Sequence, residues 1–335
     1  IMDWDTHRYL EAFFAVPMLG STLHTVNIRL SPSQIAYTID HAEDDVILFH
    51  ADFIPLLEEV MLEVKRDARL IVMRDSADIE LPHTTLKIEA IFDELFINTD
   101  QYFSFPDFDE NTRATTFYTT GTTGNPKAVA YSHRQLVLHT MGILATFGPM
   151  SANNRFHNRD VYMPITPMFH VHGWGFPYAA TMLGLKQIYP NRYVPSRILA
   201  LICEHKVTFS HCVPTILHML LDCDTAASAD LSNWKLIIGG SALSRGLAER
   251  ALAKGINLFS AYGLSETCPL LTVAQLDPND EDNLDARLKA GRPAAMVDIH
   301  VVDEAMDDVP RDGKTVGEVV ARAPWLTQTY LKDEH

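Results

Sequence analysis

The stretch Tyr118-Thr-Thr-Gly-Thr-Thr-Gly-Asn-Pro-Lys127 decides how the rest of this chain is interpreted. It holds five hydroxyl side chains, two glycines and one lysine, and it directly follows the apolar run at residues 114–117. A strand that enters such a loop exposes backbone N–H groups, which can surround a polyphosphate together with the hydroxyls and the ammonium. The common nucleotide loop needs four residues between its glycines, whereas two threonines separate Gly121 from Gly124 here. The stretch therefore indicates a phosphate-binding loop of another kind, and the alternative is an ordinary polar turn.

A second motif, Ser260-Ala-Tyr-Gly-Leu-Ser-Glu-Thr267, follows another apolar run at residues 256–259. It places an aromatic ring, a hydroxyl and a carboxylate on one short loop. These groups can stack on a base, contact a phosphate and hold a magnesium ion that bridges phosphate oxygens. Taken alone, Glu266 is more often a solvated loop acid. Because both motifs follow expected strands, and open α/β sheets bind ligands at strand ends, the pair favours a nucleotide site.

Composition limits the class of protein. The 335 residues are 47% hydrophobic and 21% charged, which is typical of a globular chain with room for two or three subdomains. The net charge of −16 argues against a nucleic-acid surface, so anionic ligands must be met by local groups. No apolar run reaches the roughly 18 residues of a membrane span, and no basic-then-apolar leader opens the chain. Ile1-Met2-Asp3-Trp4 reads as the end of a buried strand, so we expect the natural N-terminus to lie upstream.

The four cysteines indicate a reducing compartment, and we expect a cytoplasmic protein. Cys203, Cys212, Cys223 and Cys268 show no paired spacing of the kind that disulfides or zinc sites use. Cys203 and His205, with His211 and Cys212, nevertheless offer zinc ligands. The intervening residues alternate like a strand, which would point successive side chains to opposite faces. A zinc site is therefore the less favoured interpretation.

The chain alternates expected strands with expected helices. Ser31 and Pro32 begin a helix that places Ile35 and Ile39 on one face. A strand at 45–49, a helix at 54–64 and a strand at 70–73 follow, and the acidic residues 74–113 read as an irregular connector. Further strands are expected at 161–163, 186–189, 207–211, 235–238 and 257–259. This order predicts parallel sheets covered by helices, whereas the short strands at 298–302 and 316–321 predict a small β subdomain.

Several motifs together resemble one family. Besides the two loops, they are Pro167-Met-Phe-His-Val-His-Gly-Trp174, Gly239-Gly240-Ser241, Gly291-Arg292-Pro293 and Gly317-Glu318. In kind and order they resemble the large N-terminal part of the acyl-adenylate-forming (AMP-binding) superfamily, which contains acyl-CoA synthetases, peptide-synthetase adenylation domains and firefly luciferase. Within it, the chain looks most like bacterial medium- to long-chain fatty-acyl-CoA ligases. Residues 4–42 extend the similarity. Two positions depart from the family pattern, Ala128 in place of glycine and Ser265 in place of threonine.

The resemblance implies an α/β fold with two helix-covered, mostly parallel sheets packed together and a small β-barrel-like subdomain. The expected divisions are residues 1–150 with the Thr/Gly loop, 155–275 with the acyl and adenine sites, and 285–335 as the β subdomain. In the family a Tyr-Leu-Lys segment like Tyr330-Leu331-Lys332 leads to a ribose contact and a mobile C-terminal lobe. Neither appears here, so we expect the 335-residue chain by itself to be inactive.

The implied reaction is ATP-dependent activation of a fatty acid, in which an acyl-adenylate forms and CoA then displaces AMP. ATP, Mg²⁺ and CoA are the implied cofactors and co-substrates, a carboxylic acid is the partner, and a homodimer is possible. No protein nucleophile is needed, so positioning and charge neutralisation would carry the catalysis. The alternatives are a non-catalytic acid- or nucleotide-binding relative, a phosphotransferase, or a ligase for a short thioether or aromatic acid.

The resemblance also assigns residues. The implied catalytic residues are Lys127, His170 and Glu266, with magnesium held by Thr119 and Glu266. The implied phosphate contacts are Thr119, Thr120, Gly121, Thr122, Thr123, Gly124 and Lys127. The implied adenine and α-phosphate contacts are Gly239, Gly240, Ser241, Ser260, Ala261, Tyr262, Gly263 and Ser265. The acid would contact His170, Trp174 and Gly240, although a buried aromatic turn explains His170 and Trp174 as well. The apolar residues 173–185 would serve equally as an acyl wall or as core.

Overall fold

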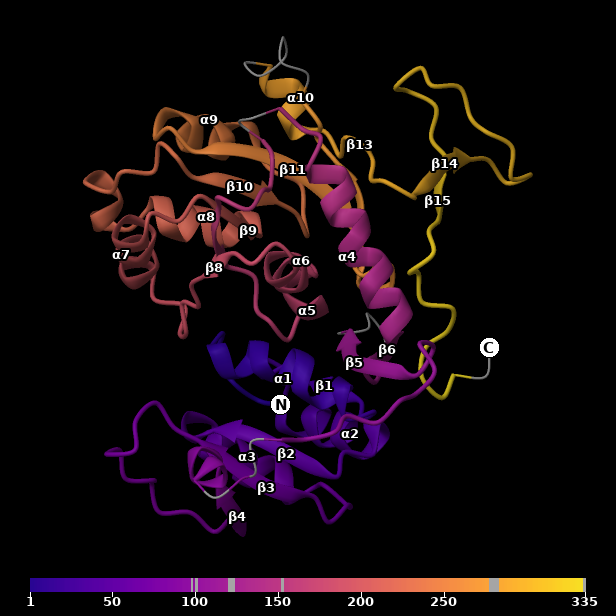
Figure 1. The fold of residues 1–335 in the computed structure, drawn as a ribbon. Coiled ribbons are helices and arrows are strands. Elements are labelled where there is room, and N and C mark those ends of the chain that lie inside the picture. The colour runs from indigo at the N-terminus through magenta and orange to yellow at the C-terminus, as the bar shows by residue number, and fades with distance from the viewer. Residues whose placement is uncertain (98, 100–101, 120–123, 152–153, 277–282, 334–335) are drawn as a thin grey trace. The chain divides into compact units, whose positions relative to one another are not determined.

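The structure is a computed structural model that describes the whole chain except residues 98, 100–101, 120–123, 152–153, 277–282 and 334–335. The chain divides into two compact units (Figure 1). Unit 1 contains Ile1–His133, Pro167–His172 and Thr327–His335, and unit 2 contains Arg134–Thr166 and Gly173–Leu326. The expected division into three subdomains stays a prediction.

Unit 1 contains a three-stranded parallel sheet. Its strands, in order, are β2 (Val46–His50), β3 (Arg69–Met73) and β4 (Ile88–Ile91). Two helices pack together with it around one apolar core, α2 (Pro32–Ala42) and α3 (Ile54–Met61). Strand β4 and the 3₁₀ helix η2 (Phe92–Phe96) correct the expectation that residues 74–113 are irregular. Strand β4 was missed because its residues are only half-buried, so they carry no strong apolar signal.

Helix α2 begins where the sequence predicts. The Ser31 hydroxyl accepts a hydrogen bond from the Gln34 backbone N–H at 3.3 Å, and the Gln34 side chain accepts one from the Ser31 N–H at 3.2 Å. This capping box satisfies two N–H groups at the start of the helix. Ile35 and Ile39 are fully buried, which confirms the predicted apolar face.

A second sheet of unit 1 carries the Thr/Gly motif. Its strands, in order, are β1 (Leu23–Thr25), β5 (Arg113–Thr119) and β6 (Lys127–Ser132). β5 runs parallel to β1 and antiparallel to β6. The last residues of the chain continue the pairing, because Tyr330 bridges Val129 and the Leu331 N–H donates to the Ala128 carbonyl at 2.9 Å. Helix α1 (His7–Met18) and the 3₁₀ helix η1 (Ala51–Phe53) also belong to this unit.

Unit 2 is built on a seven-stranded sheet with the order β13-β12-β11-β10-β9-β7-β8. Five neighbouring strands are parallel: β11 (Asn257–Gly263), β10 (Lys235–Ile238), β9 (Phe209–Cys212), β7 (Val161–Pro164) and β8 (Lys186–Gln187). The two strands at the other edge run antiparallel to their neighbours, β12 (Leu270–Val273) and β13 (Arg292–Pro293). Every strand that the sequence predicted in this unit up to residue 263 is present.

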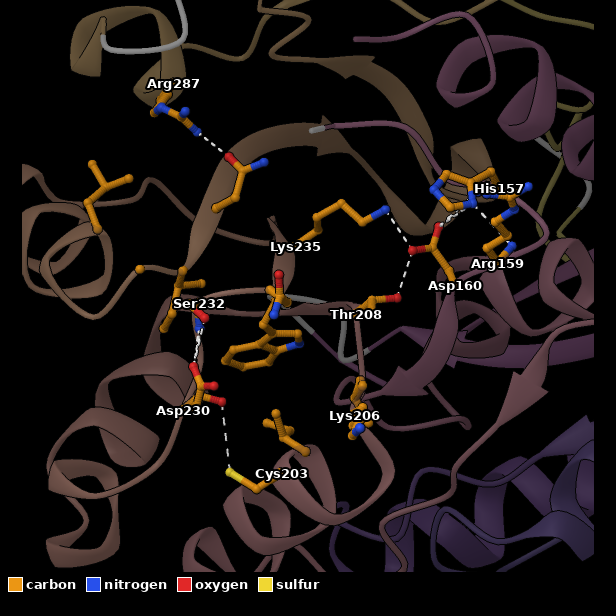
Figure 2. Close-up of a pocket in the computed structure, with 18 residues that line it drawn as sticks. His157, Arg159, Asp160, Cys203, Lys206, Thr208, Asp230, Ser232, Lys235 and Arg287 are labelled. Atoms are coloured by element: carbon orange, nitrogen blue, oxygen red, sulfur yellow. Dashed lines mark hydrogen bonds and ion pairs between the residues drawn. The ribbon is translucent and has the colours of Figure 1, made fainter. Parts of the chain in front are cut away.

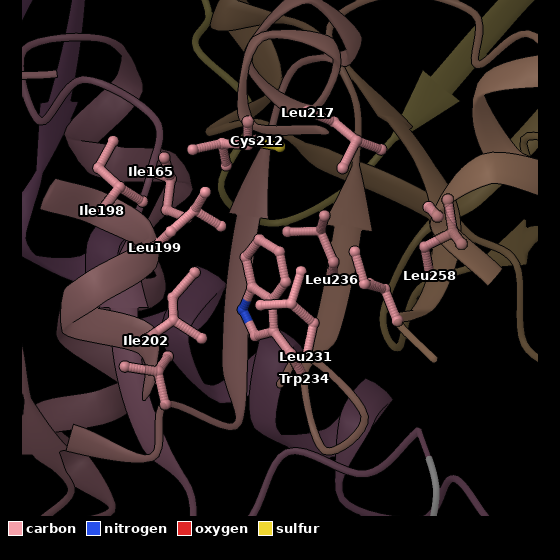
Figure 3. Close-up of a cluster of buried hydrophobic side chains, with 14 of the residues drawn as sticks. Ile165, Ile198, Leu199, Ile202, Cys212, Leu217, Leu231, Trp234, Leu236 and Leu258 are labelled. Carbon is pink, nitrogen blue, oxygen red and sulfur yellow. The ribbon is translucent and has the colours of Figure 1, made fainter. Parts of the chain in front are cut away.

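Helices cover both faces of this sheet. Leu236 and Leu258 face a core formed with α7 (Pro195–His205), α8 (Pro214–Leu221) and α9 (Arg245–Ala253) (Figure 3). Trp234 fills the centre of that core, and its indole N–H donates to the Ser210 hydroxyl at 2.9 Å. On the other face, Phe209 packs on Phe147 of α4 (His133–Phe147) and on Phe176 of α6 (Phe176–Met182), with centroid distances of 6.2 and 5.5 Å.

The remaining elements of unit 2 are short. They are α10 (Leu284–Leu288), the 3₁₀ helices η3 (Asp224–Ala227) and η4 (Ser265–Thr267), and the antiparallel hairpin of β14 (Asp298–Val302) and β15 (Glu318–Arg322). The chain is thus mixed α/β with several mostly parallel sheets, as predicted, whereas the barrel-like form of the last part stays a prediction. In the part of the chain that the structure describes, no helix is long and apolar enough to cross a membrane.

Candidate functional site

The Thr/Gly motif connects two paired strands of unit 1. Thr119 ends β5, Lys127 begins β6, and the two residues are direct partners in the antiparallel ladder. The Thr119 hydroxyl also donates to the Lys127 carbonyl at 3.4 Å. Gly124 has a φ of +103°, a backbone conformation that glycine tolerates best. The pairing of β5 with β6 thus brings the two ends of the expected phosphate loop together. Thr120, Gly121, Thr122 and Thr123 lie outside the described residues.

Lys127 extends over an aromatic ring. Its ammonium lies 4.7 Å from the centroid of Tyr330, while the side chain stays exposed. Tyr330 is held in place because its segment pairs with β6 and because the Lys332 ammonium binds the Glu43 carboxylate at 2.7 Å. Sequence reasoning missed this contact, since nothing in the pattern relates residue 330 to the loop. The tyrosine limits where the loop lysine can point.

Two hydrogen bonds within unit 1 hold the residues that precede His170. The Met168 N–H donates to the Asp5 carboxylate at 2.9 Å, and the Thr25 hydroxyl donates to the Phe169 carbonyl at 3.0 Å. His170 itself is exposed. Neighbouring protein atoms nevertheless restrict its hydration, and with the positive charge of Arg29 they lower the pKa of its imidazole. The ring is therefore neutral at pH 7, a donor and acceptor of hydrogen bonds rather than a cation.

The next residues form a left-handed turn. In α5 (Val171–Trp174) the φ angles are +49° at Val171, +54° at His172 and +60° at Trp174. Such angles are costly for residues other than glycine, and most of all for a β-branched valine. His172 is fully buried among the rings of Phe13, Phe117 and Tyr131, and burial lowers its pKa to about 3. His172 is thus a core histidine, which agrees with the alternative that part of this motif is a buried aromatic turn.

In unit 2, Trp174 meets the Gly239–Gly240 pair. A Cβ atom at Gly239 would lie 3.0 Å from the Trp174 ring and 3.3 Å from the Ala261 carbonyl oxygen. A Cβ at Gly240 would lie 3.0 Å from Val213, and its φ is +78°. The structure therefore brings together three groups of the expected site, Trp174, the glycine pair and Ala261. Glycine fits position 239 because the indole and the neighbouring strand approach it closely, and it fits position 240 because the φ there is positive.

His211 supports Trp174 from behind. The two rings stack with centroids 5.2 Å apart and an interplanar angle of 26°. One ring nitrogen of His211 is bonded to the Thr166 hydroxyl at 3.0 Å and the other to the Tyr162 hydroxyl at 2.7 Å. Burial lowers the pKa of His211 to about 3, so the ring is neutral. Hydroxyl groups thus occupy both nitrogens, and the sequence, which offered His211 as a zinc ligand, did not reveal this supporting role.

The second motif is more strand than loop. β11 continues to Gly263, so Ser260, Ala261, Tyr262 and Gly263 are strand residues, which corrects the predicted end at residue 259. The strand pairs in parallel with β10 up to Ser260 and then in antiparallel fashion with β12. This second pairing prolongs the strand beyond its apolar run. The buried Ser260 hydroxyl has no hydrogen-bond partner among the residues that the structure describes, so a polar group remains to be satisfied beside Gly239.

Ser265 and Glu266 follow in η4, and both are partly exposed. The turn is fixed by Thr267, whose hydroxyl accepts a hydrogen bond from the Leu264 N–H at 2.9 Å. Ser241 directly follows the glycine pair and is exposed. Thr119 and His170 belong to unit 1 and Glu266 to unit 2. The joint action of these residues on one ligand therefore stays a prediction.

Comparison with known proteins identifies the family. The family model described as AMP-binding enzyme matches residues 1–331. A long-chain-fatty-acid–CoA ligase from Thermus thermophilus is 38% identical over 99% of this chain and 60% of its own length. A 3-methylmercaptopropionyl-CoA ligase from Ruegeria pomeroyi is 36% identical and a medium-chain-fatty-acid–CoA ligase from Ectopseudomonas oleovorans is 32% identical, each over 99% of this chain. The chain spans about three fifths of the length of these relatives.

Solved structures share the fold. A long-chain-fatty-acid–CoA ligase from Archaeoglobus fulgidus superposes with a TM-score of 0.80 at 20% identity, over 99% of this chain and 64% of that one. An anthranilate CoA ligase gives a TM-score of 0.82 at 19% identity, over 99% and 61%. The family match over nearly the whole chain agrees with the sequence motifs and with the fold. This chain belongs to the AMP-binding enzyme family.

Proposed function

We propose that this protein activates a fatty acid with ATP and transfers the acyl group to CoA. The observation that carries the proposal is the meeting of Trp174, Gly239–Gly240 and Ala261 at the carboxyl ends of β10 and β11. Open α/β sheets bind their ligands at the carboxyl ends of their strands. The family match and the fatty-acid ligases at 38% and 32% identity support the same reaction.

In the proposed first step, a carboxylate oxygen of the acid attacks the α-phosphorus of ATP and the bond to the bridging oxygen of pyrophosphate breaks. In the second step, the CoA sulfur attacks the acyl carbon and AMP leaves. Lys127 and the backbone N–H group of Gly124 would meet the negative charge of the outer phosphates. The neutral imidazole of His170 would hold the acid by a hydrogen bond without adding charge.

The oxygen donors that we assign to magnesium suit that ion. Glu266 offers a partly exposed carboxylate and Thr119 offers a hydroxyl, and magnesium prefers such hard oxygen ligands together with phosphate. When bound, the ion would neutralise phosphate charge. Tyr262 would flank the adenine ring opposite the glycine pair, Ser265 would contact the α-phosphate, and the unsatisfied Ser260 hydroxyl lies in the same region.

We propose a medium- or long-chain alkyl acid as the substrate. Trp174 would stand at the entrance of the acyl site, and Phe176 and Tyr178 supply buried apolar surface behind it. Met182 is 55% exposed and contributes nothing to such a wall. A short thioether acid is the second candidate, because the Ruegeria relative at 36% identity is described as a 3-methylmercaptopropionyl-CoA ligase. The four cysteines are free thiols, which supports a reducing compartment such as the cytoplasm.

The test is ATP–pyrophosphate exchange by the full-length protein with a panel of acids. Exchange that depends on octanoate or palmitate supports the proposal. Exchange that responds only to a short thioether acid would select the second candidate. A phosphorylated product would indicate a phosphotransferase instead, and an intact, folded protein that catalyses no exchange with any acid would indicate a binding protein.

A further inference from the structure

A large cavity lies at the amino ends of the parallel strands in the seven-stranded sheet of unit 2. It has a volume of about 980 Å³, which is within the usual range for small-molecule sites. The loops that enter β7, β9, β10 and β11 line it, so it surrounds the amino ends of four parallel strands (Figure 2). The Trp174 and Gly239–Gly240 cluster lies at the carboxyl ends, and the cavity is therefore separate from the site proposed above.

A buried ion pair forms the fixed part of this cavity. The Lys235 ammonium lies 2.7 Å from the Asp160 carboxylate, and the Thr208 hydroxyl donates to the same carboxylate at 2.7 Å. The side chains of Lys235 and Asp160 are only 10% and 2% exposed. Because the two charges neutralise each other, this pair supplies shape and rigidity rather than a free charge.

Besides Lys235, the cavity is lined by the buried Arg287, which donates to the Asn257 side chain at 2.7 Å, and by two exposed cations. Arg159 lies in the turn at residues 157–160, which is closed by a hydrogen bond from the His157 N–H to the Asp160 carboxylate at 2.8 Å. Lys206 lies between α7 and β9. Both residues are exposed, and their charged ends contact no acid among the residues that the structure describes. In a chain with a net charge of −16, two unpaired cations in one hollow form a local site for an anion.

The backbone at Lys206 determines which substitution tests its side chain best. Its φ is +53°, and its N–H ends α7 by donating to the Ile202 carbonyl. Glycine is the residue that suits this left-handed position, so a lysine there costs stability. A glycine at this position would therefore keep the backbone conformation while removing the ammonium. Across the cavity the Asp230 carboxylate accepts hydrogen bonds on one oxygen from the backbone N–H and hydroxyl of Ser232, at 3.1 and 2.7 Å, and these neutral donors leave it negatively charged.

We propose that this cavity binds the phosphate group of a small phosphorylated molecule through Arg159 and Lys206. Two cations match the charge of a phosphate dianion, and the planar guanidinium offers paired N–H donors for its oxygens. The volume greatly exceeds that of a phosphate ion, so the ligand carries a larger organic part. Leu252 provides apolar surface for that part, and Asn233 provides an amide group.

Cys203 offers a reporter inside the cavity. Its exposed thiol lines the cavity, whereas Cys223 is half-buried outside it and serves as the internal control. The experiment measures the rate at which iodoacetamide, a neutral reagent, labels each thiol while inorganic pyrophosphate is added as the probe. At ten times the Kd about one eleventh of the sites remain free, so labelling of Cys203 should slow about tenfold. Sodium chloride at equal ionic strength should leave both rates unchanged, and an equal effect of the salt would overturn the proposal.

Variants separate this site from a general charge effect. Lys206→Gly removes the ammonium but suits the left-handed backbone, so it should fold at least as stably and bind pyrophosphate about tenfold more weakly. Arg159→Gln should weaken binding similarly, while Lys186→Ala, which removes an exposed lysine outside the cavity, should change nothing. Undiminished protection in the Lys206→Gly, Arg159→Gln double variant would overturn the proposal.

The Lys127→Ala variant distinguishes the cavity from the proposed reaction site. Pyrophosphate is also the proposed product of adenylation, and Lys127 would contact it there. Lys127→Ala should abolish pyrophosphate exchange yet leave the protection of Cys203 intact. Loss of protection in this variant would mean that the signal arises at the Thr/Gly loop, and the cavity would not be a phosphate site. Whether pyrophosphate protects Cys203 does not depend on whether the protein activates a fatty acid.

Discussion

A methyl group at Gly239 would press against the Trp174 ring at 3.0 Å and the Ala261 carbonyl at 3.3 Å. We expect Gly239→Ala to destabilise unit 2 by about 1–3 kcal/mol, because neither a buried indole nor a strand can move freely. Binding of a non-reactive acyl-adenylate analogue should weaken at least about tenfold, as measured by calorimetry. Gly246→Ala is the matched control, since a Cβ there meets nothing within 4 Å. Equal effects of the two changes would contradict the assigned role of Gly239.

The contact between Lys127 and Tyr330 predicts a graded response. Tyr330→Phe keeps an aromatic face 4.7 Å from the ammonium, whereas Tyr330→Leu removes it. A cation–π contact at an exposed site is worth about 0.5–1 kcal/mol, so the rate of pyrophosphate exchange should fall about two- to fivefold in the leucine variant. The phenylalanine variant should stay close to the parent. The positioning role is refuted if both variants lose the same activity.

Glu266 is partly exposed in η4 and makes no large contribution to the core. If its carboxylate holds magnesium, Glu266→Gln should slow adenylation by roughly a hundredfold or more, the scale of losing a preorganised charge contact. The free energy of unfolding should change little. Raising the magnesium concentration should restore part of the rate, and near-normal exchange at ordinary magnesium would remove Glu266 from the site.

The burial of His172 predicts a pH dependence of stability. Burial lowers the pKa of His172 from 6.5 to about 3, so the unfolded chain binds a proton that the folded chain does not between those values. Stability contributed by this histidine is complete above pH 6.5 and is lost as the pH falls toward 3. At pH 5 the loss is about 2 kcal/mol. His172→Phe, which keeps a ring among Phe13, Phe117 and Tyr131, should show a correspondingly smaller loss between pH 7 and pH 5 in denaturant titrations. Identical slopes for the two proteins would contradict the assignment.

Some elements could be predicted from sequence because local and tertiary preferences agree in them. Helix α2 has its capping residues and apolar face in one short stretch, and β10 matches its predicted bounds of 235–238. β11 was predicted too short because its last residues owe their strand form to pairing with β12. The left-handed turn at Val171 could not be predicted, since the local preferences of valine oppose it.

The residues of the candidate site likewise fall into those that the sequence could predict and those that it could not. The glycines and hydroxyls of the two motifs were recognisable because their residue types are unusual at those spacings. The supporting shell was not recognisable: His211 behind Trp174 and Tyr330 beside Lys127 act through contacts between residues far apart in the chain. Such residues carry no local pattern, and His211 even suggested a metal ligand.

At the scale of the whole molecule, the two ends of the parallel strands in the large sheet of unit 2 differ chemically. The carboxyl ends offer glycine backbone, Trp174 and the unsatisfied Ser260 hydroxyl, whereas the amino ends line the cavity that contains Arg159 and Lys206. With a net charge of −16, the chain repels anions at long range. The proposed anionic ligands would therefore depend on these local groups, and salt should weaken such contacts less than it weakens long-range effects.

The substrate preference is the prediction that belongs to the whole molecule. Burial of one methylene contributes only about 0.8 kcal/mol, so a protein that selects its acid through an apolar site should discriminate gradually. We expect kcat/KM of the full-length protein to rise by no more than about fourfold per added methylene up to a medium or long chain. The measurement is acyl-CoA formation across straight-chain acids from butyrate to palmitate, with 3-methylmercaptopropionate and benzoate as competitors. A hundredfold preference for either competitor over octanoate and palmitate would contradict the alkyl substrate while leaving the proposed adenylation chemistry intact, because the proposed phosphate and adenine contacts do not involve the acid.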